Sequence, residues 1–136
     1  MLEQKALFYY NNGTYSEAIR YFDQLIHLDS TKGEYYFKRG YSYGKQFDQF
    51  EEFINYEKAI ELNYDVADAN FNIATIAFTN DQDSIAIVYL DKSLKAGSTK
   101  YKDIQLLKKM CIQNLALQKT DAWKEFQEYK KRTKQN

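Results

Sequence analysis

Apolar and polar residues follow one another along this chain with the period of an α-helix. Within YSEAIRYFDQLIHLD at 15–29, apolar side chains recur at intervals of three and four residues, which places them on one helix face. Thr14 followed by Glu17 has the form of a capping box, in which the two side chains satisfy the first free N–H groups of a helix. The pattern predicts a helix over 15–29 with one buried face.

The same pattern predicts seven more helices. We expect them near 2–12, 34–46, 49–62, 66–79, 82–96, 99–118 and 121–132. The segments between them are short and rich in turn-forming or N-capping residues, as in Asn11-Asn12-Gly13 and Gly97-Ser98. The chain has no proline and little β-branched alternation, so strands have little support. Eight helices joined by tight turns would form four hairpins.

The helix at 15–29 returns twice in altered form. Its copies are QFEEFINYEKAIELN at 49–63 and DSIAIVYLDKSLKAG at 83–97, so the spacing is 34 residues each time. A lone hairpin cannot bury its apolar stripes, whereas hairpins stacked in register share one continuous core. The repeat therefore favours a stack of hairpins over the alternative, an up-down bundle around one axis.

These residues resemble the tetratricopeptide repeat, a helical hairpin of 34 residues. Its signature pairs a small residue and an aromatic on the first helix with a small, an aromatic and another small residue on the second. The corresponding residues here are Ala6, Tyr9, Ala18, Phe22 and Leu25 in the first copy, Gly40, Tyr43, Glu52, Tyr56 and Ala59 in the second, and Ala74, Ala77, Ala86 and Leu90 in the third. Small side chains let two helix axes approach, and the aromatic rings fill the adjoining hollow. Leu25 and Glu52 depart from the pattern, and the proline usual after the second helix is missing.

The resemblance implies an all-α fold, a right-handed α-α superhelix (solenoid) that forms a single domain over 1–136. Its repeats would cover about 1–32, 33–66 and 67–98, followed by a divergent or capping helical pair at 99–132. The terminal segment WKEFQEYKKRTKQN is expected to be a closing helix over the last hydrophobic face, because a terminal repeat must present a polar outer face to water.

The resemblance also implies a binding surface. Proteins of this family usually bind extended peptides or helices on the concave surface lined by the first helix of each pair. The register places on that surface Glu3, Leu7, Tyr10, Phe37, Lys38, Tyr41, Lys45, Phe71, Asn72, Thr75, Phe78, Lys102, Leu106, Lys109 and Gln113. Aromatic rings provide contact area, and lysines or an amide engage a carboxylate or a backbone, so we expect a partner with apolar anchors and some negative charge.

Two further interpretations of this surface remain open. Phe37, Tyr41, Phe71 and Phe78 would serve packing alone if they lie against neighbouring helices or a terminal segment. A carboxylate clamp for the acidic tails of heat-shock chaperones, known in this family, is matched here only by Asn72 and Lys102. The sequence therefore does not favour a chaperone tail as the partner.

The charge distribution and the absence of catalytic motifs limit the functions that we expect for this chain. Residues 1–68 hold 7 basic and 12 acidic side chains (−5) and residues 69–136 hold 12 and 7 (+5), which is not the dense basic face that nucleic-acid binding needs. Cys111 and His27 are the only residues of their kinds, so neither an internal disulfide nor a multi-cysteine zinc site is expected. No phosphate-binding loop or nucleophile motif appears. We predict a non-enzymatic adaptor that needs no cofactor and no metal.

The sequence also leaves alternative functions open and suggests a cellular location. Self-association into a homo-oligomeric scaffold is the main alternative, and RNA binding by a related helical repeat is a lesser one. No transmembrane span is expected, since no run approaches 18 apolar residues. Nucleic-acid and membrane partners are disfavoured, because the terminal segment 123–136 lacks the density of basic groups and the stacking platform that such binding uses. With no secretory leader visible and a single cysteine, we expect a cytoplasmic protein, or a fragment of a larger one.

Overall fold

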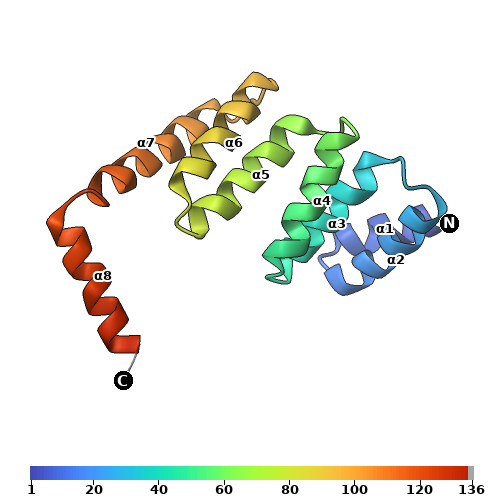
Figure 1. The fold of residues 1–136 in the computed structure, drawn as a ribbon. Helices are drawn as coiled ribbons and strands as arrows, with labels where there is room; N and C mark the ends of the chain where they lie inside the picture. The colour runs from blue at the N-terminus through green and yellow to red at the C-terminus, as the bar shows by residue number, and fades with distance from the viewer. Residues whose placement is uncertain (135–136) are drawn as a thin grey trace.

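The computed structural model describes residues 1–134, which form eight α-helices and no strand (Figure 1). The helices are α1 (Leu2–Asn11), α2 (Tyr15–Leu28), α3 (Gly33–Lys45), α4 (Gln49–Glu61), α5 (Val66–Thr79), α6 (Asp83–Lys95), α7 (Tyr101–Leu117) and α8 (Asp121–Lys134). Each predicted helix is confirmed, with ends within two residues of those expected from the apolar period. Gln135 and Asn136, the end of the domain expected over 1–136, lie outside the described residues.

Successive helices pack as a stack of hairpins. α1 packs on α2, α3 on α4 and α5 on α6, while α2–α3, α4–α5 and α6–α7 join each hairpin to the next. The hairpins follow one another along the molecule and do not gather around a central axis (Figure 1). The fold is an all-α helical-repeat solenoid, so the bundle alternative is wrong.

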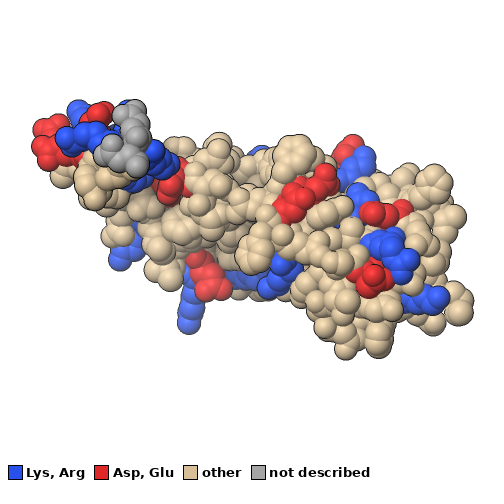
Figure 2. All heavy atoms as spheres, turned by 90° about the horizontal axis from the view of Figure 1, so that it is seen from below, with Lys and Arg blue, Asp and Glu red and all other residues tan. Residues whose placement is uncertain are grey.

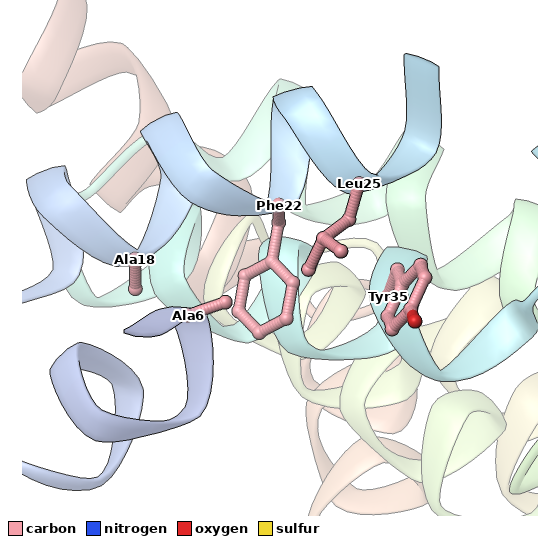
Figure 3. Close-up of a cluster of buried hydrophobic side chains, with 5 residues drawn as sticks. All are labelled: Ala6, Ala18, Phe22, Leu25 and Tyr35. Carbon is pink, nitrogen blue, oxygen red and sulfur yellow. The ribbon is translucent and has the colours of Figure 1, made fainter. Parts of the chain in front are cut away.

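The first hairpin shows why its signature residues have these sizes. Ala6 of α1 and Ala18 of α2 are fully buried, which lets the two helices approach closely. The ring of Phe22 lies beside Ala6, and Tyr35 of α3 extends the cluster to the next hairpin (Figure 3). The packing explanation of the small and aromatic positions is confirmed here.

The second hairpin accommodates Glu52 where a small residue is usual. A Cβ added to Gly40 would lie 2.9 Å from the Cβ of Asn55, so α3 and α4 need a glycine at this crossing. One turn later, the Glu52 carboxyl group occupies the space above Gly44, where a Cβ would collide with it. Gly44 therefore makes room for the bulky residue on α4, while Gly40 allows the close crossing at Asn55.

The expected capping box at α2 is wrong. Thr14 is the N-cap residue, but its side chain makes no capping hydrogen bond. Arg20, one turn along α2, instead donates to the Glu17 carboxylate with a Nη2–Oε2 distance of 2.6 Å. Asp48 does cap α4, because its Oδ1 accepts a hydrogen bond from the Glu51 N–H at 3.1 Å.

The prediction that the last helix covers the final hydrophobic face is also wrong. α8 follows α7 after the turn 118–120, buries none of its described residues and makes no extensive packing contact with another helix of residues 1–134. Figure 1 shows it pointing away from the end of the solenoid. Lys108 of α7 stands where the signature has a small residue, and its ammonium group lies 2.5 Å from Asp91 Oδ1 of α6. Lys108 is therefore directed toward α6 and is not the small residue that the signature has at this position.

Candidate functional site

The predicted binding residues all lie on α1, α3, α5 or α7. Tyr10 is on α1, Phe37, Lys38, Tyr41 and Lys45 are on α3, Phe71, Asn72, Thr75 and Phe78 are on α5, and Lys102 and Lys109 are on α7. We call these eleven residues the inner surface. Of the other residues expected there, Glu3 and Leu7 are on α1, and Leu106 and Gln113 are on α7.

Tyrosine rings and lysine ammonium groups form the part of the inner surface on α1 and α3. The ring centroids of Tyr10 and Tyr41 lie 5.5 Å apart. Lys38 Nζ lies 5.2 Å from the centroid of Tyr10, and Lys45 Nζ lies 5.2 Å from that of Tyr41. Burial, followed by neighbouring tyrosines, raises the pKa of Tyr10 to about 12, so its hydroxyl is neutral at physiological pH. The structure therefore brings these four residues together.

The other aromatic residues of the inner surface belong partly to the core. The Phe37 centroid lies 5.2 Å from that of Tyr56 and 5.7 Å from that of Tyr64. Phe71 packs against the cluster around Leu90, and Phe78 against the cluster around Cys111. All three are only half-buried, so each ring has a packing role and also an accessible edge.

Lys100 joins this surface although the sequence did not single it out. Its Nζ lies 4.9 Å from the centroid of Phe71 and 2.8 Å from Asp68 Oδ1. The sequence predicted a helix that begins at residue 99, so Lys100 would have been part of its first turn. In the structure Lys100 is instead the N-cap of α7. The sequence feature that could have indicated Lys100 is that it is a second lysine, two residues before Lys102.

Glu52 adds a titratable group beside the inner surface. Burial raises the pKa of its carboxyl to about 7, and the nearby Lys45 ammonium opposes the shift. Burial, with Glu52 adding to it, also raises the pKa of Tyr56. The charge next to Lys45 therefore changes near neutral pH.

Replacing Glu52 by glutamine is expected to stabilise the protein at alkaline pH. The folded pKa of about 7 exceeds the ordinary value of 4.5, so the stability from this group is present below about pH 4.5 and is lost as the pH rises to 7. Because Glu52 is only half-buried, we expect Glu52→Gln to raise the free energy of unfolding by about 1–2 kcal/mol at pH 8 and by little at pH 4. Urea denaturation at both pH values measures the difference.

The control is Glu3→Gln, at an exposed glutamate of α1. It is expected to change the stability little at either pH. An equal effect of Glu52→Gln at pH 4 and pH 8 would contradict the assignment of this pH dependence to Glu52.

The remaining candidate groups form no catalytic arrangement in the described part of the chain. Among residues 1–134, no three His, Cys, Asp or Glu side chains lie close enough together to hold a metal ion. His27 is exposed on α2. Cys111 is fully buried, and burial, together with Asp83, raises the pKa of its thiol to about 11, so the thiol stays protonated.

Charges of both signs are distributed along the molecule. On the face in Figure 2, groups of Lys and Arg alternate with groups of Asp and Glu, separated by wide uncharged areas. No helix within 1–134 has the length and apolar content to cross a membrane. The view contains no continuous basic face of the kind that binds nucleic acid.

The comparisons with known proteins agree with this architecture. Residues 1–32 match the family model described as tetratricopeptide repeat. The chain contains a tetratricopeptide repeat. The matched region is the first hairpin, with Ala6, Ala18 and Phe22 at its signature positions. No curated protein sequence matches the chain significantly.

Several solved structures share the fold of this chain. The TPR2B domain of yeast Sti1, in a complex with pHsp70, has a TM-score of 0.72 and 17% identity, covering 82% of this chain and 94% of that one. The Yersinia enterocolitica type III secretion chaperone SycD, with a peptide of the translocator YopD, has a TM-score of 0.72 and 16% identity, covering 88% and 92%. The MamA protein has a TM-score of 0.70 and 18% identity, covering 85% and 68%. At these identities the likeness shows the fold alone.

Proposed function

We propose that this chain is a non-enzymatic interaction module that binds a segment of another protein on the inner surface. The observation that carries the proposal is the group formed by Tyr10, Lys38, Tyr41 and Lys45, in which two successive hairpins present tyrosine rings with ammonium groups next to them. Two proteins of similar fold, yeast Sti1 TPR2B and SycD, are described in complexes with pHsp70 and a YopD peptide, which supports a peptide ligand here.

The charges of the inner surface favour an acidic segment with apolar anchors. Lys45, Lys102 and Lys109 are exposed, and none forms an ion pair within residues 1–134. The accessible edges of the half-buried rings offer apolar contact at the same surface, so an anchor and a carboxylate can be bound together. The proposed module comprises repeats at about 1–32, 33–66 and 67–98 and the divergent region 99–132.

The three exposed lysines provide the test. Peptides are selected from a random peptide display library with the unmodified chain, and their affinities are measured by fluorescence anisotropy. We expect the selected peptides to be rich in acidic and apolar residues. Lys45→Ala, Lys102→Ala and Lys109→Ala together should weaken their binding about tenfold, because each exposed charge contributes up to about 1 kcal/mol.

The matched control replaces Lys5, Lys32 and Lys119, which are exposed lysines outside the inner surface, by alanine. It makes the same change in net charge and should leave the affinity within about twofold. A library that yields no binder, or binders that the two triple variants weaken equally, would contradict the proposed site.

A further inference from the structure

A carboxyl group from a second helix lies against the backbone of the inner surface. The side chain of Glu52 reaches from α4 to α3, and its carboxyl occupies the space that a Cβ on Gly44 would fill. The next residue of α3 is Lys45, an exposed member of the inner surface whose Nζ lies 5.2 Å from the centroid of the Tyr41 ring. An acidic group that is not part of the inner surface is therefore held beside one of its ammonium groups.

No group in the described chain offsets the cost of burying a charge on Glu52. The carboxyl is half-buried and forms no ion pair within residues 1–134. Burial and the ammonium of Lys45 are the influences on its pKa, and no hydrogen bond to the carboxylate adds to them. An ionised carboxylate that loses water without gaining a donor is destabilised relative to the neutral acid. Glu52 therefore takes up a proton much more readily than an exposed glutamate does.

The helices packed against α4 bring one charge close to this carboxyl. α4 packs on α3 and on α5. From α3 the charged neighbour is Lys45, and from α4 itself the titratable neighbour is Tyr56, whose pKa is raised by burial and then by Glu52, so that its hydroxyl stays neutral. α5 has a single charged residue, Asp68, in its first turn, whereas the start of α4 contacts the end of α5. Lys45 is therefore the charge that Glu52 influences most directly.

We propose that the protonation of Glu52 regulates the binding of acidic segments at the inner surface, with tighter binding below neutral pH than above it. This inference rests on the proposed function and adds a proton dependence to it. When Glu52 is protonated, the positive charge of Lys45 is free to attract a carboxylate of the ligand. When Glu52 is ionised, its negative charge offsets that of Lys45 and repels the same carboxylate.

The direction of the pH dependence follows from the charges. The affinity should be highest where Glu52 is protonated and should fall as the pH rises through about 7, the pKa of this carboxyl. Because the two equilibria are linked, a bound acidic segment must in turn raise the pKa of Glu52. His27 is the only histidine of the chain and is exposed on α2, which contributes no residue to the inner surface.

The first test measures the coupling of Glu52 to Lys45 in the chain without a ligand. Nuclear magnetic resonance follows the side-chain carboxyl carbons of ¹³C-labelled glutamate as the pH is changed. We expect one carboxyl to titrate near pH 7 and to be missing from the spectrum of Glu52→Gln. Lys45→Ala should move this titration to higher pH, because the ammonium group favours the ionised carboxyl. A titration that Lys45→Ala leaves unchanged would overturn the proposal.

The second test measures the affinity for an acidic peptide at pH 6 and pH 8. The probe is a peptide selected by display that contains no histidine and has an acetylated N-terminus, so its own charge is constant between these pH values. By fluorescence anisotropy we expect the unmodified chain to bind it about threefold more weakly at pH 8 than at pH 6. Glu52→Gln should bind it equally at the two pH values, within about 1.5-fold. Circular dichroism at each pH verifies that both proteins are folded.

The matched control is Glu61→Gln, at an exposed glutamate near the other end of α4 that pairs with Lys58. It makes the same chemical change and should keep the threefold pH dependence of the unmodified chain. Equal affinity of the unmodified chain at pH 6 and pH 8, or an unchanged pH dependence in Glu52→Gln, would overturn this proposal while leaving the binding site intact. A library that yields no binder would instead contradict the proposed function, and this inference with it.

Discussion

Tyr56→Ala is expected to lower the free energy of unfolding by about 3–5 kcal/mol. Tyr56 is the largest fully buried side chain and is 1% exposed. Its ring lies against Phe37 of α3 and packs with Ala69 and Ile73 of α5, so it joins the second hairpin to the third. Truncation leaves a cavity at this junction. Urea denaturation followed by circular dichroism measures the loss.

The position of Tyr56 predicts a second effect of the same substitution. In a solenoid each repeat is stabilised by its neighbours, so a cavity at a central junction weakens the coupling between the two ends. We expect hydrogen exchange to show α1–α3 and α5–α7 opening at different urea concentrations. Phe50→Ala, at a residue of α4 that is 72% exposed, is the control and should change stability by less than about 0.5 kcal/mol. A loss below about 1 kcal/mol for Tyr56→Ala would contradict the assigned role.

Phe22→Ala is expected to cost a similar amount, about 3–5 kcal/mol, but at one end of the stack. Phe22 is fully buried between Ala6 and Tyr35, with its ring 6.2 Å from that of Tyr10. Because α1 and α2 form the terminal hairpin, its loss leaves the later hairpins able to stack. Hydrogen exchange should therefore accelerate in α1, α2 and the start of α3 while α5 and α6 keep most of their protection.

The control for this variant is Phe8→Ala, which removes a ring of α1 that is 60% exposed. It should leave the exchange pattern close to that of the unmodified chain. Uniform acceleration across all helices in Phe22→Ala would show that the solenoid unfolds as one unit, contrary to this prediction.

The helices were predictable because a local property sets them. Apolar residues at intervals of three and four, interrupted by turn residues, specify each helix whatever its neighbours do. The 34-residue spacing then predicted the hairpin stack, because equivalent faces recur at equivalent places. The exception is Thr14, where the sequence admits both a capping box and the Arg20–Glu17 ion pair that the structure contains.

The candidate site was predictable only in part. The register placed Tyr10, Lys38, Tyr41 and Lys45 on first helices, and their mutual contacts follow from the stacking of the first hairpin on the second. Lys100 was missed because it depends on the residue at which α7 begins. Glu52 was recognised as a departure from the repeat, but its raised pKa requires the burial that Gly44 makes room for.

By itself the sequence determined the eight helices, their pairing into hairpins and the sizes of the residues at each crossing. These features depend on the spacing of apolar residues and on side-chain volumes, both of which can be read over a short stretch of the chain. The tertiary structure alone decided which aromatic rings are shared between core and surface, how Glu52 fits above Gly44, and that α8 buries none of its described residues. These features depend on distances and angles between helices. A change of a few ångströms in helix approach alters them while the apolar period stays the same.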